Sequence, residues 1–277
     1  MRGGARIVDE PRAMSEGLAY GARVLAVIAG SEFKQKYAGS VLGYVWTLLK
    51  PLGLFAVLYV VFGRFFKLTI GFDHYPLYLL IGLVLWYFFA DGTWVAMPSV
   101  VSQGSLVQKL AFPRLLIPAS ATITVALTFA VNLVALAAFV AGNRIVPRPA
   151  WLALLPLFLE LYLFTFAVSV LLATLYVRFR DTGQLWELAS MILFWGSPII
   201  YPVEFLPPWG QPIVFFNPFV QVMQDVRGLI IGSSNVPTVT DQLGAFGHLA
   251  PLGVLALTLA VALVLFSHEE RSFAERI

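Results

Sequence analysis

Apolar stretches as long as a membrane is thick recur along this chain. A helix rises about 1.5 Å per residue, so it needs about 20 residues to cross roughly 30 Å of hydrocarbon. The sequence predicts spans, with boundaries to within several residues, at 41–66, 76–101, 112–141, 150–177, 184–201 and 248–266. Only 12% of the 277 residues are charged and 59% are hydrophobic, against about 25% charged in soluble domains. We therefore expect an all-α membrane protein whose residues 1–277 form a single transmembrane domain.

The segment 15–38, before the first span, separates polar from apolar residues. On a helix, Glu16 and Arg23 fall near one face, and Leu18 and Leu25 fall near another. This pattern is typical of an amphipathic helix that lies along the membrane interface. Arg23 also interrupts the first apolar run, which argues against a signal peptide.

The basic residues indicate an orientation. About thirteen Lys and Arg side chains fall on the side that holds both termini, and about five fall opposite, which predicts that both termini are cytoplasmic. The long connection before the last span then lies outside. Its parts Trp209 to Phe216 and Phe219 to Ile231 are too apolar for a free loop. We expect residues 202–231 to form short re-entrant helices whose connections are buried in protein or line water.

Polar and aromatic residues recur at helical spacing within four spans. They are Tyr87, Asp91, Trp94 and Pro98 in the second span, Ser120, Thr124, Thr128 and Asn132 in the third, Tyr162, Thr165, Ser169 and Tyr176 in the fourth, and Ser190, Phe194, Ser197 and Tyr201 in the fifth. Aromatic rings stack on sugars and hydroxyls exchange hydrogen bonds with them, so such stripes suit a sugar pathway. Close helix packing is the alternative, since small hydroxyl residues also let membrane helices approach.

The predicted substrate path combines members of these stripes with aromatic residues around the first span. It consists of Tyr37, Tyr44, Trp46, Tyr59, Tyr87, Asp91, Trp94, Thr128, Asn132, Ser190, Phe194, Ser197 and Tyr201. Within it, Asp91 lies mid-span, where a bare charge costs on the order of 3 kcal/mol or more, so a functional role is expected. Glu160, in the outer third of the fourth span, should likewise be protonated, paired or wet.

Several chemistries lack their signatures. The chain has no cysteine and hence no thiolate chemistry, its three histidines at 74, 248 and 268 do not cluster, and a net charge of +3 implies no nucleic-acid partner. The phosphate-binding pattern GxxxxGK[ST] is absent, so an ATP-driven mechanism needs another chain to hydrolyse ATP. A secondary transporter stays open, although six spans are few for one. An intramembrane serine hydrolase built on Ser197 and His248 is the enzymatic alternative.

Four motifs in order resemble the ABC-2 type permeases that export polysaccharides and teichoic acids. The first, Tyr-x-x-Ser-x-Leu-Gly-x-x-Trp followed by Pro, is carried by Tyr37, Ser40, Leu42, Gly43, Trp46 and Pro51. Lys-x-x-Phe-Pro-Arg follows at 109–114, then VRFRD at 177–181, and SPIIYP at 197–202 with Asn-Pro at 217–218. These motifs cover most of the chain from residue 34 onward.

The resemblance implies a homodimer in a bacterial cytoplasmic membrane, with a nucleotide-binding subunit docked on each half. ATP and Mg²⁺ would bind to that partner, and this chain would be a transport subunit without a cofactor. The expected substrate is a lipid-linked polysaccharide such as O-antigen or cell-wall galactan; an ABC-2 permease for a small drug or lipid is the runner-up. The residues expected to couple to the ATPase are Glu32, Lys34, Lys36, Lys109, Phe112, Pro113, Arg114, Arg178 and Asp181.

Overall fold

The computed structural model describes residue 25 and residues 29–31, 43–67, 74–104, 113–232 and 236–273, without the side chains of 43–45 and 271. Every regular element in these residues is helical, which confirms the all-α prediction. Most of the predicted interface helix 15–38 lies outside the described residues. The longer elements are α2 (Gly43–Leu58) with its π-helical continuation η1 (Tyr59–Phe65), α3 (Tyr75–Ala96), α6 (Leu116–Gly142), η2 with α7 (Pro149–Ala153 and Leu154–Arg178), α8 (Thr182–Gly196), α10 (Pro218–Ile231) and α12 (Leu249–Glu269). The short ones are α4 (Ser99–Ser102), η3 (Val203–Phe205), α9 (Gly210–Val214), α11 (Val239–Leu243) and η4 (Glu270–Ser272).

Five helices within the described residues are long and apolar enough to cross a membrane. They are Trp46–Phe65, Tyr75–Ala96, Leu116–Gly142, Pro149–Arg178 and Leu249–Glu269. Each overlaps one of the predicted spans, namely the first to the fourth and the last. Their length and composition make this chain a multi-pass membrane protein.

The prediction for the remaining span, 184–201, is wrong in its extent. Helix α8 has 15 residues and ends at Gly196, so it is about 22 Å long, short of the hydrocarbon thickness. The next residue, Ser197, is extended with φ −89° and ψ 142°. Because Pro198 follows, Ser197 is disfavoured from the helical conformation, which ends the helix there.

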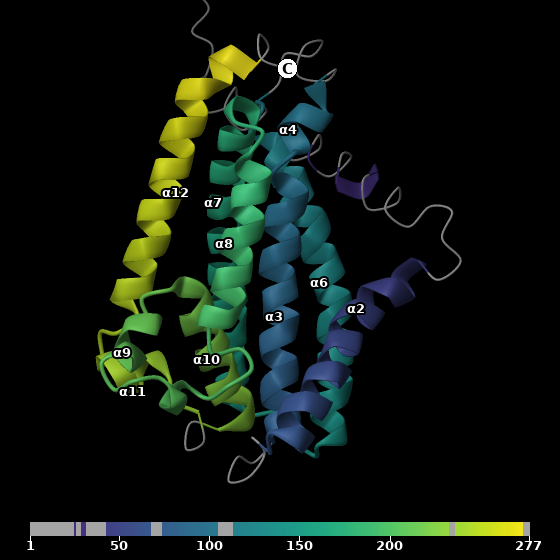
Figure 1. Ribbon diagram of the computed structural model, residues 1–277, viewed down its shortest axis with the longest axis vertical. Coiled ribbons are helices and arrows are strands. Elements are labelled where there is room, and N and C mark those ends of the chain that lie inside the picture. The colour runs from purple at the N-terminus through teal and green to yellow at the C-terminus, as the bar shows by residue number, and fades with distance from the viewer. Residues whose placement is uncertain are drawn as a thin grey trace, which may run out of the picture.

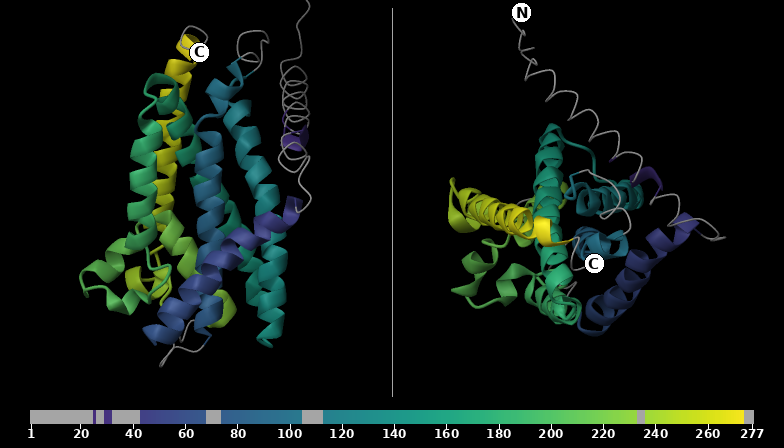
Figure 2. Two further views of the ribbon diagram at one scale, coloured as in Figure 1. Left: turned by 45° about the vertical axis from the view of Figure 1, so that its right-hand side comes forward. Right: turned by 90° about the horizontal axis from the view of Figure 1, so that it is seen from above.

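The long helices stand side by side around α3 (Figure 1). Helix α3 packs against α6, α7 and α10, and α12 packs against α7. In Figure 1 the end of α12 and the start of α8 lie at the top, called the upper end here, and the start of α3 lies at the lower end. Helix α2 crosses the lower half of the bundle obliquely (Figure 2). The apolar stretch of the α3 span is 72% buried, against 17% for the span formed by α2 and η1, so α3 is the central helix.

Helix α10 occupies the depth of the bundle without crossing it. It begins beside the middle of α3, where Phe219 packs on Trp86 with ring centroids 5.4 Å apart. It ends near the start of α7, where Trp151 Nε1 donates to the Leu229 carbonyl at 3.0 Å. The side chain of Asn217 caps the helix by accepting from Phe219 N at 3.0 Å. All its residues except Leu229 and Ile231 are buried, the geometry that the re-entrant prediction requires.

Candidate functional site

Helix α3 is buried on all sides except one. Its less buried residues are Tyr87, Ala90, Asp91, Trp94 and Val95, with Trp94 37% and Val95 43% exposed, and they continue to Pro98 just past the helix end. Three of them, with Pro98, are the predicted stripe of the second span, so the structure does bring that stripe together on one face, called the α3 face below. Figure 1 shows α3 between α8 and α2, so these two helices flank it.

The stripe predicted in the fifth span points into the bundle instead. Ser190 and Ser197 are 9% and 3% exposed, and Ser190 Oγ donates to the Glu187 carbonyl within its own helix at 2.9 Å. Phe194 packs on Trp86 with ring centroids 5.4 Å apart. Farther along, the Tyr201 hydroxyl donates to the Trp195 carbonyl at 3.0 Å. These contacts fit the helix-packing alternative better than an open pathway.

The stripes of α6 and α7 are also internal. On α6, the hydroxyl of Thr128 donates to the Thr124 carbonyl at 3.1 Å, and both side chains are buried. Asn132 is 6% exposed, and its Oδ1 has no hydrogen-bond partner among the described residues. On α7, Ser169 Oγ donates to the Gly92 carbonyl of α3 at 3.3 Å. A Cβ at Gly92 would lie 2.5 Å from Thr165 Cγ2, so these polar and small residues serve close helix contact.

Helix α2 contributes aromatic residues of two kinds. Trp46 is 49% exposed, whereas Tyr59 is half-buried and stacks on Phe55 at 5.9 Å between ring centroids. Tyr37 and the side chain of Tyr44 lie outside the described residues. Among the path residues that the structure describes, there is therefore no single continuous surface, and the α3 face and Trp46 are the open parts.

A fully buried arginine on α10, which the sequence analysis missed, holds the connection after α8. Arg227 is 0% exposed. Its Nε donates to the Tyr78 carbonyl at 3.0 Å, Nη1 to the Pro198 carbonyl at 2.8 Å and Nη2 to the Ile199 carbonyl at 2.8 Å. The guanidinium carbon also lies 3.4 Å from the centroid of the Tyr78 ring. Within the described part of the chain, backbone carbonyls, the Gln224 side chain and an aromatic face stabilise this cation, and no carboxylate pairs with it.

Two tyrosines of α3 complete this attachment. The Tyr75 hydroxyl donates to the Ile200 carbonyl at 3.0 Å, and the Tyr78 hydroxyl lies 3.1 Å from the Pro198 carbonyl and 3.0 Å from the Tyr201 carbonyl. Residues 198–201 thus have their backbone acceptors satisfied by α3 and α10, as irregular backbone at membrane depth requires. We call residues 198–201 together with Arg227 the arginine clasp.

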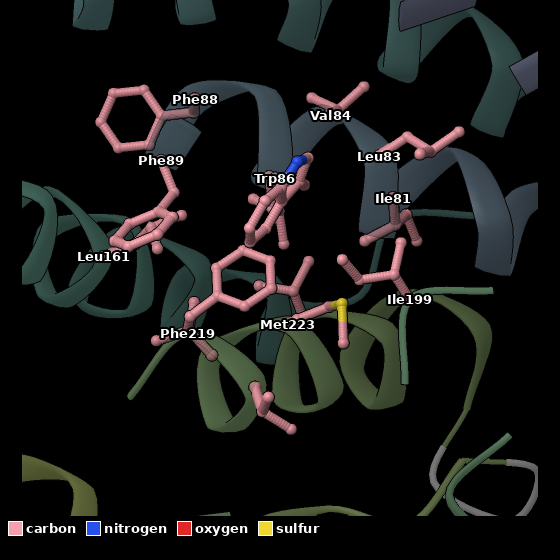
Figure 3. Close-up of a cluster of buried hydrophobic side chains, with 14 of the residues drawn as sticks. Ile81, Leu83, Val84, Trp86, Phe88, Phe89, Leu161, Ile199, Phe219 and Met223 are labelled. Carbon is pink, nitrogen blue, oxygen red and sulfur yellow. The ribbon is translucent and has the colours of Figure 1, made fainter. Parts of the chain in front are cut away.

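The clasp adjoins an aromatic core between α3 and α10. Figure 3 shows Trp86, Phe89, Phe219 and Met223 facing one another there, with Ile199 close by. Beside it lies a cavity of about 290 Å³ that Ser197 and Phe219 help to line. Gly82 of α3 provides the room for the guanidinium, because a Cβ at this position would collide with Arg227 Nη2.

The comparison with protein families decides what kind of protein has this architecture. The family model of the ABC-2 type transporter matches residues 23–231, a stretch that runs from before α2 to the end of α10. This chain belongs to the ABC-2 type transporter family. The matched stretch includes the α3 face, α8 and the arginine clasp.

Curated relatives of this ABC-2 permease carry one name. The chain is 30% identical over 219 residues to an O-antigen export system permease protein RfbA of Klebsiella pneumoniae, covering 79% of this chain and 84% of that protein. It is 25% identical over 258 residues to the protein of the same name from Myxococcus xanthus, covering 92% and 95%. The likeness therefore covers about four fifths of this chain in the first relative and more than nine tenths in the second.

At the upper end, two of the predicted coupling residues of the permease, Arg114 and Arg178, have intramolecular partners. Arg114 N lies 3.4 Å from Glu270 Oε1, and the Arg114 guanidinium donates to the Glu270 carbonyl. Arg178 forms an ion pair with Glu269 at 3.1 Å. Pro113 and Asp181 are exposed. Glu32, Lys34, Lys36, Lys109 and Phe112 lie outside the described residues, and the coupling assignment stays a prediction.

The hydrolase alternative finds no support in the positions of its two residues. Ser197 lines the cavity beside the aromatic core. His248 lines a different cavity, where its Nδ1 lies 3.7 Å from Asp225 Oδ2. Membership of a transporter family agrees with this separation.

Proposed function

We propose that this chain is the transmembrane subunit of an ATP-driven exporter that moves a lipid-linked polysaccharide across the bacterial cytoplasmic membrane. Relatives that match 79% and 92% of this chain are named O-antigen export system permease proteins. The structural observation that carries the proposal is the α3 face, where Tyr87, Asp91 and Trp94 are accessible on a helix that is otherwise buried. A lipid-facing surface has no use for an acid and a tyrosine, whereas a sugar path uses both.

A single chain leaves this face open, so we place a second copy opposite it. The passage would then run between two α3 faces, with α2 and α8 of each copy at its sides. The outward side of α8 is strongly apolar and exposed at Leu185, Leu188 and Met191. Such a surface suits either lipid or a partner helix, so the polar α3 face, not α8, sets the position of the proposed dimer axis.

The energy source belongs to another chain, because the phosphate-binding pattern is absent here. We place one ATP-binding subunit against the upper end of each copy. The positive-inside pattern assigns this end to the cytoplasm. The N-terminal segment and the 102–113 loop would meet that subunit. ATP-driven closure of the two subunits would move these contacts and open the passage. The re-entrant segment 202–231, held by the arginine clasp, would form the outer closure.

Co-purification of this chain with candidate ATP-binding subunits from the same organism tests the assembly. The proposal predicts a two-plus-two complex by mass and ATPase activity that rises with lipid-linked polymer. Depletion of the permease should leave lipid-linked polymer on the cytoplasmic leaflet. A lone permease without an ATPase partner, or depletion without polymer accumulation, would contradict it.

A further inference from the structure

A second cavity lies between α7, α10, α11 and the start of α12, and none of its lining residues comes from α3. Its volume is about 570 Å³, within the roughly 300–1,000 Å³ range of small-molecule sites. Four charged or titratable side chains line it: Glu160 of α7, Asp225 of α10, His248 before α12 and Arg148 before η2. We call it the α7–α10 cavity.

The polarity of the α7–α10 cavity is graded from outside to inside. Arg148 is exposed, and the His248 side chain is 45% exposed. The Asp225 side chain is only 9% exposed, and Glu160 Oε1 is shielded from solvent. A ligand that enters therefore meets the Arg148 guanidinium and the His248 imidazole first and carboxylates at depth.

Of the two inner carboxylates, Asp225 has partners on both oxygens, whereas Glu160 is not fully partnered. Asp225 accepts from Gln221 Nε2 at 2.7 Å and from Val239 N at 3.0 Å. Glu160 Oε1, by contrast, has no hydrogen-bond partner among the described residues. A buried acceptor without a donor is costly, and it points to a missing donor. The nearest arginine along α10, Arg227, is committed to backbone carbonyls and does not supply it.

The position of the α7–α10 cavity suits a membrane ligand. Arg148 and His248 directly precede two candidate spans, Pro149–Arg178 and Leu249–Glu269, and span ends lie near the level of lipid headgroups. Leu157 and Leu252 form part of its apolar wall. Outside it, Leu155 of α7 is 71% exposed, a surface against which acyl chains can lie.

We propose that the α7–α10 cavity binds a zwitterionic headgroup with a terminal ammonium and a phosphate, as in phosphatidylethanolamine. The ammonium enters first and donates to Glu160 and Asp225. The phosphate remains with Arg148, which carries the complementary charge, and with His248, whose ring can donate a hydrogen bond. This site does not depend on the export pathway, because it shares no residue with the α3 face.

Lipid binding to the purified full-length chain tests the proposal. Native mass spectrometry would compare phosphatidylethanolamine with phosphatidylcholine of the same acyl chains, because a trimethylammonium group has no N–H to donate. We expect about tenfold tighter binding of phosphatidylethanolamine, the difference of about one charge-assisted hydrogen bond. Glu160→Gln should make the binding affinities of the two lipids nearly equal. Glu187→Gln, an exposed glutamate on α8, is the matched control and should retain the preference.

Two further measurements separate the alternatives. Glycerophosphoethanolamine, which has no acyl chains, should compete only weakly with phosphatidylethanolamine for the cavity. If it displaces the lipid fully, and its own binding still depends on Glu160, the cavity binds the free zwitterion and the headgroup assignment holds. Arg148→Gln, on the exposed rim, should weaken the binding of both lipids, and this variant remains a test even if the Glu160 variant fails to fold. Equal binding of both lipids, or a preference that survives Glu160→Gln, would overturn the proposal and leave Glu160, Gln221 and Asp225 as internal hydrogen-bonding groups.

Discussion

Removal of the Arg227 guanidinium should loosen residues 198–201 while the helical bundle stays folded. In Arg227→Met, the Ile199 carbonyl loses its donor at 2.8 Å. The Tyr78 hydroxyl carries a single hydrogen, which can pass to the Pro198 carbonyl at 3.1 Å or stay with the part-buried Tyr201 carbonyl at 3.0 Å. At least one fully buried acceptor, the Ile199 carbonyl, is left without a donor. That loss costs about 1–3 kcal/mol, which corresponds to about a 5- to 150-fold rise in the locally open population.

A thiol at Ile200 would report this opening. The natural chain has no cysteine, so Ile200→Cys introduces a single reactive group at a site that is 2% exposed. The labelling rate with a small maleimide should rise by that factor in Arg227→Met. In Arg227→Lys, which keeps the charge but has fewer donors, the labelling rate should lie between those of the natural arginine and Arg227→Met. A thiol placed by Ala262→Cys, buried on α12, should react equally in all backgrounds. An unchanged rate at position 200 in a folded Arg227→Met protein would refute the clasp.

Further predictions concern single positions. Gly82→Ala should lower thermal stability by about 1–3 kcal/mol, because the added methyl overpacks against the held guanidinium; Gly53→Ala, where a Cβ meets nothing within 4 Å, should leave stability equal or slightly higher in the same melting experiment. Asp91→Asn should reduce polymer export in cells while the amount of ATPase complex that co-purifies stays constant, and reduced complex would instead mean a structural role. Hydrogen bonds from Thr238 Oγ1 and N hold the pKa of Asp241 below its ordinary value. The stability that this cap adds to α11 is therefore present above the ordinary carboxyl pKa and is lost as the pH falls through the lowered pKa of the folded state. Hydrogen exchange of residues 239–243 should rise in that acidic range, and no rise would contradict the cap.

The α3 face could be predicted from sequence because its signal is local. Tyr87, Asp91 and Trp94 follow one helical period, and that period survives whatever packs around the helix. Pro76 near the start of α3 and Pro98 just beyond its end also mark its limits closely. The same periodicity could not distinguish an inward stripe from an open one, since hydroxyls that bond to their own helix look identical in sequence. Ser190 and Thr128 belong to this second kind.

The clasp could not be predicted in the same way, because its contacts are distant in sequence. Arg227 and Tyr78 are 149 residues apart, and the groups that receive the guanidinium are carbonyls, which every residue has. The one available signal was an arginine within an apolar segment expected to enter the membrane. The short α8 had a local signal as well, Ser197 before Pro198, but hydropathy continued past it and set the predicted boundary at 201.

The central claim is tested most directly by measuring whether the α3 face lines a passage that holds water at rest and polymer during transport. Trp94→Cys would give the otherwise cysteine-free permease a single thiol within the permease–ATPase complex. A hydrophilic maleimide would then be applied with and without lipid-linked polymer trapped in transit. We expect labelling in the resting complex and protection when polymer is present, whereas Val84→Cys, on the buried side of α3, should stay unlabelled. Labelling of the Trp94→Cys thiol only by a lipid-soluble reagent, unaffected by polymer, would show that this face meets lipid and would contradict the proposed pathway.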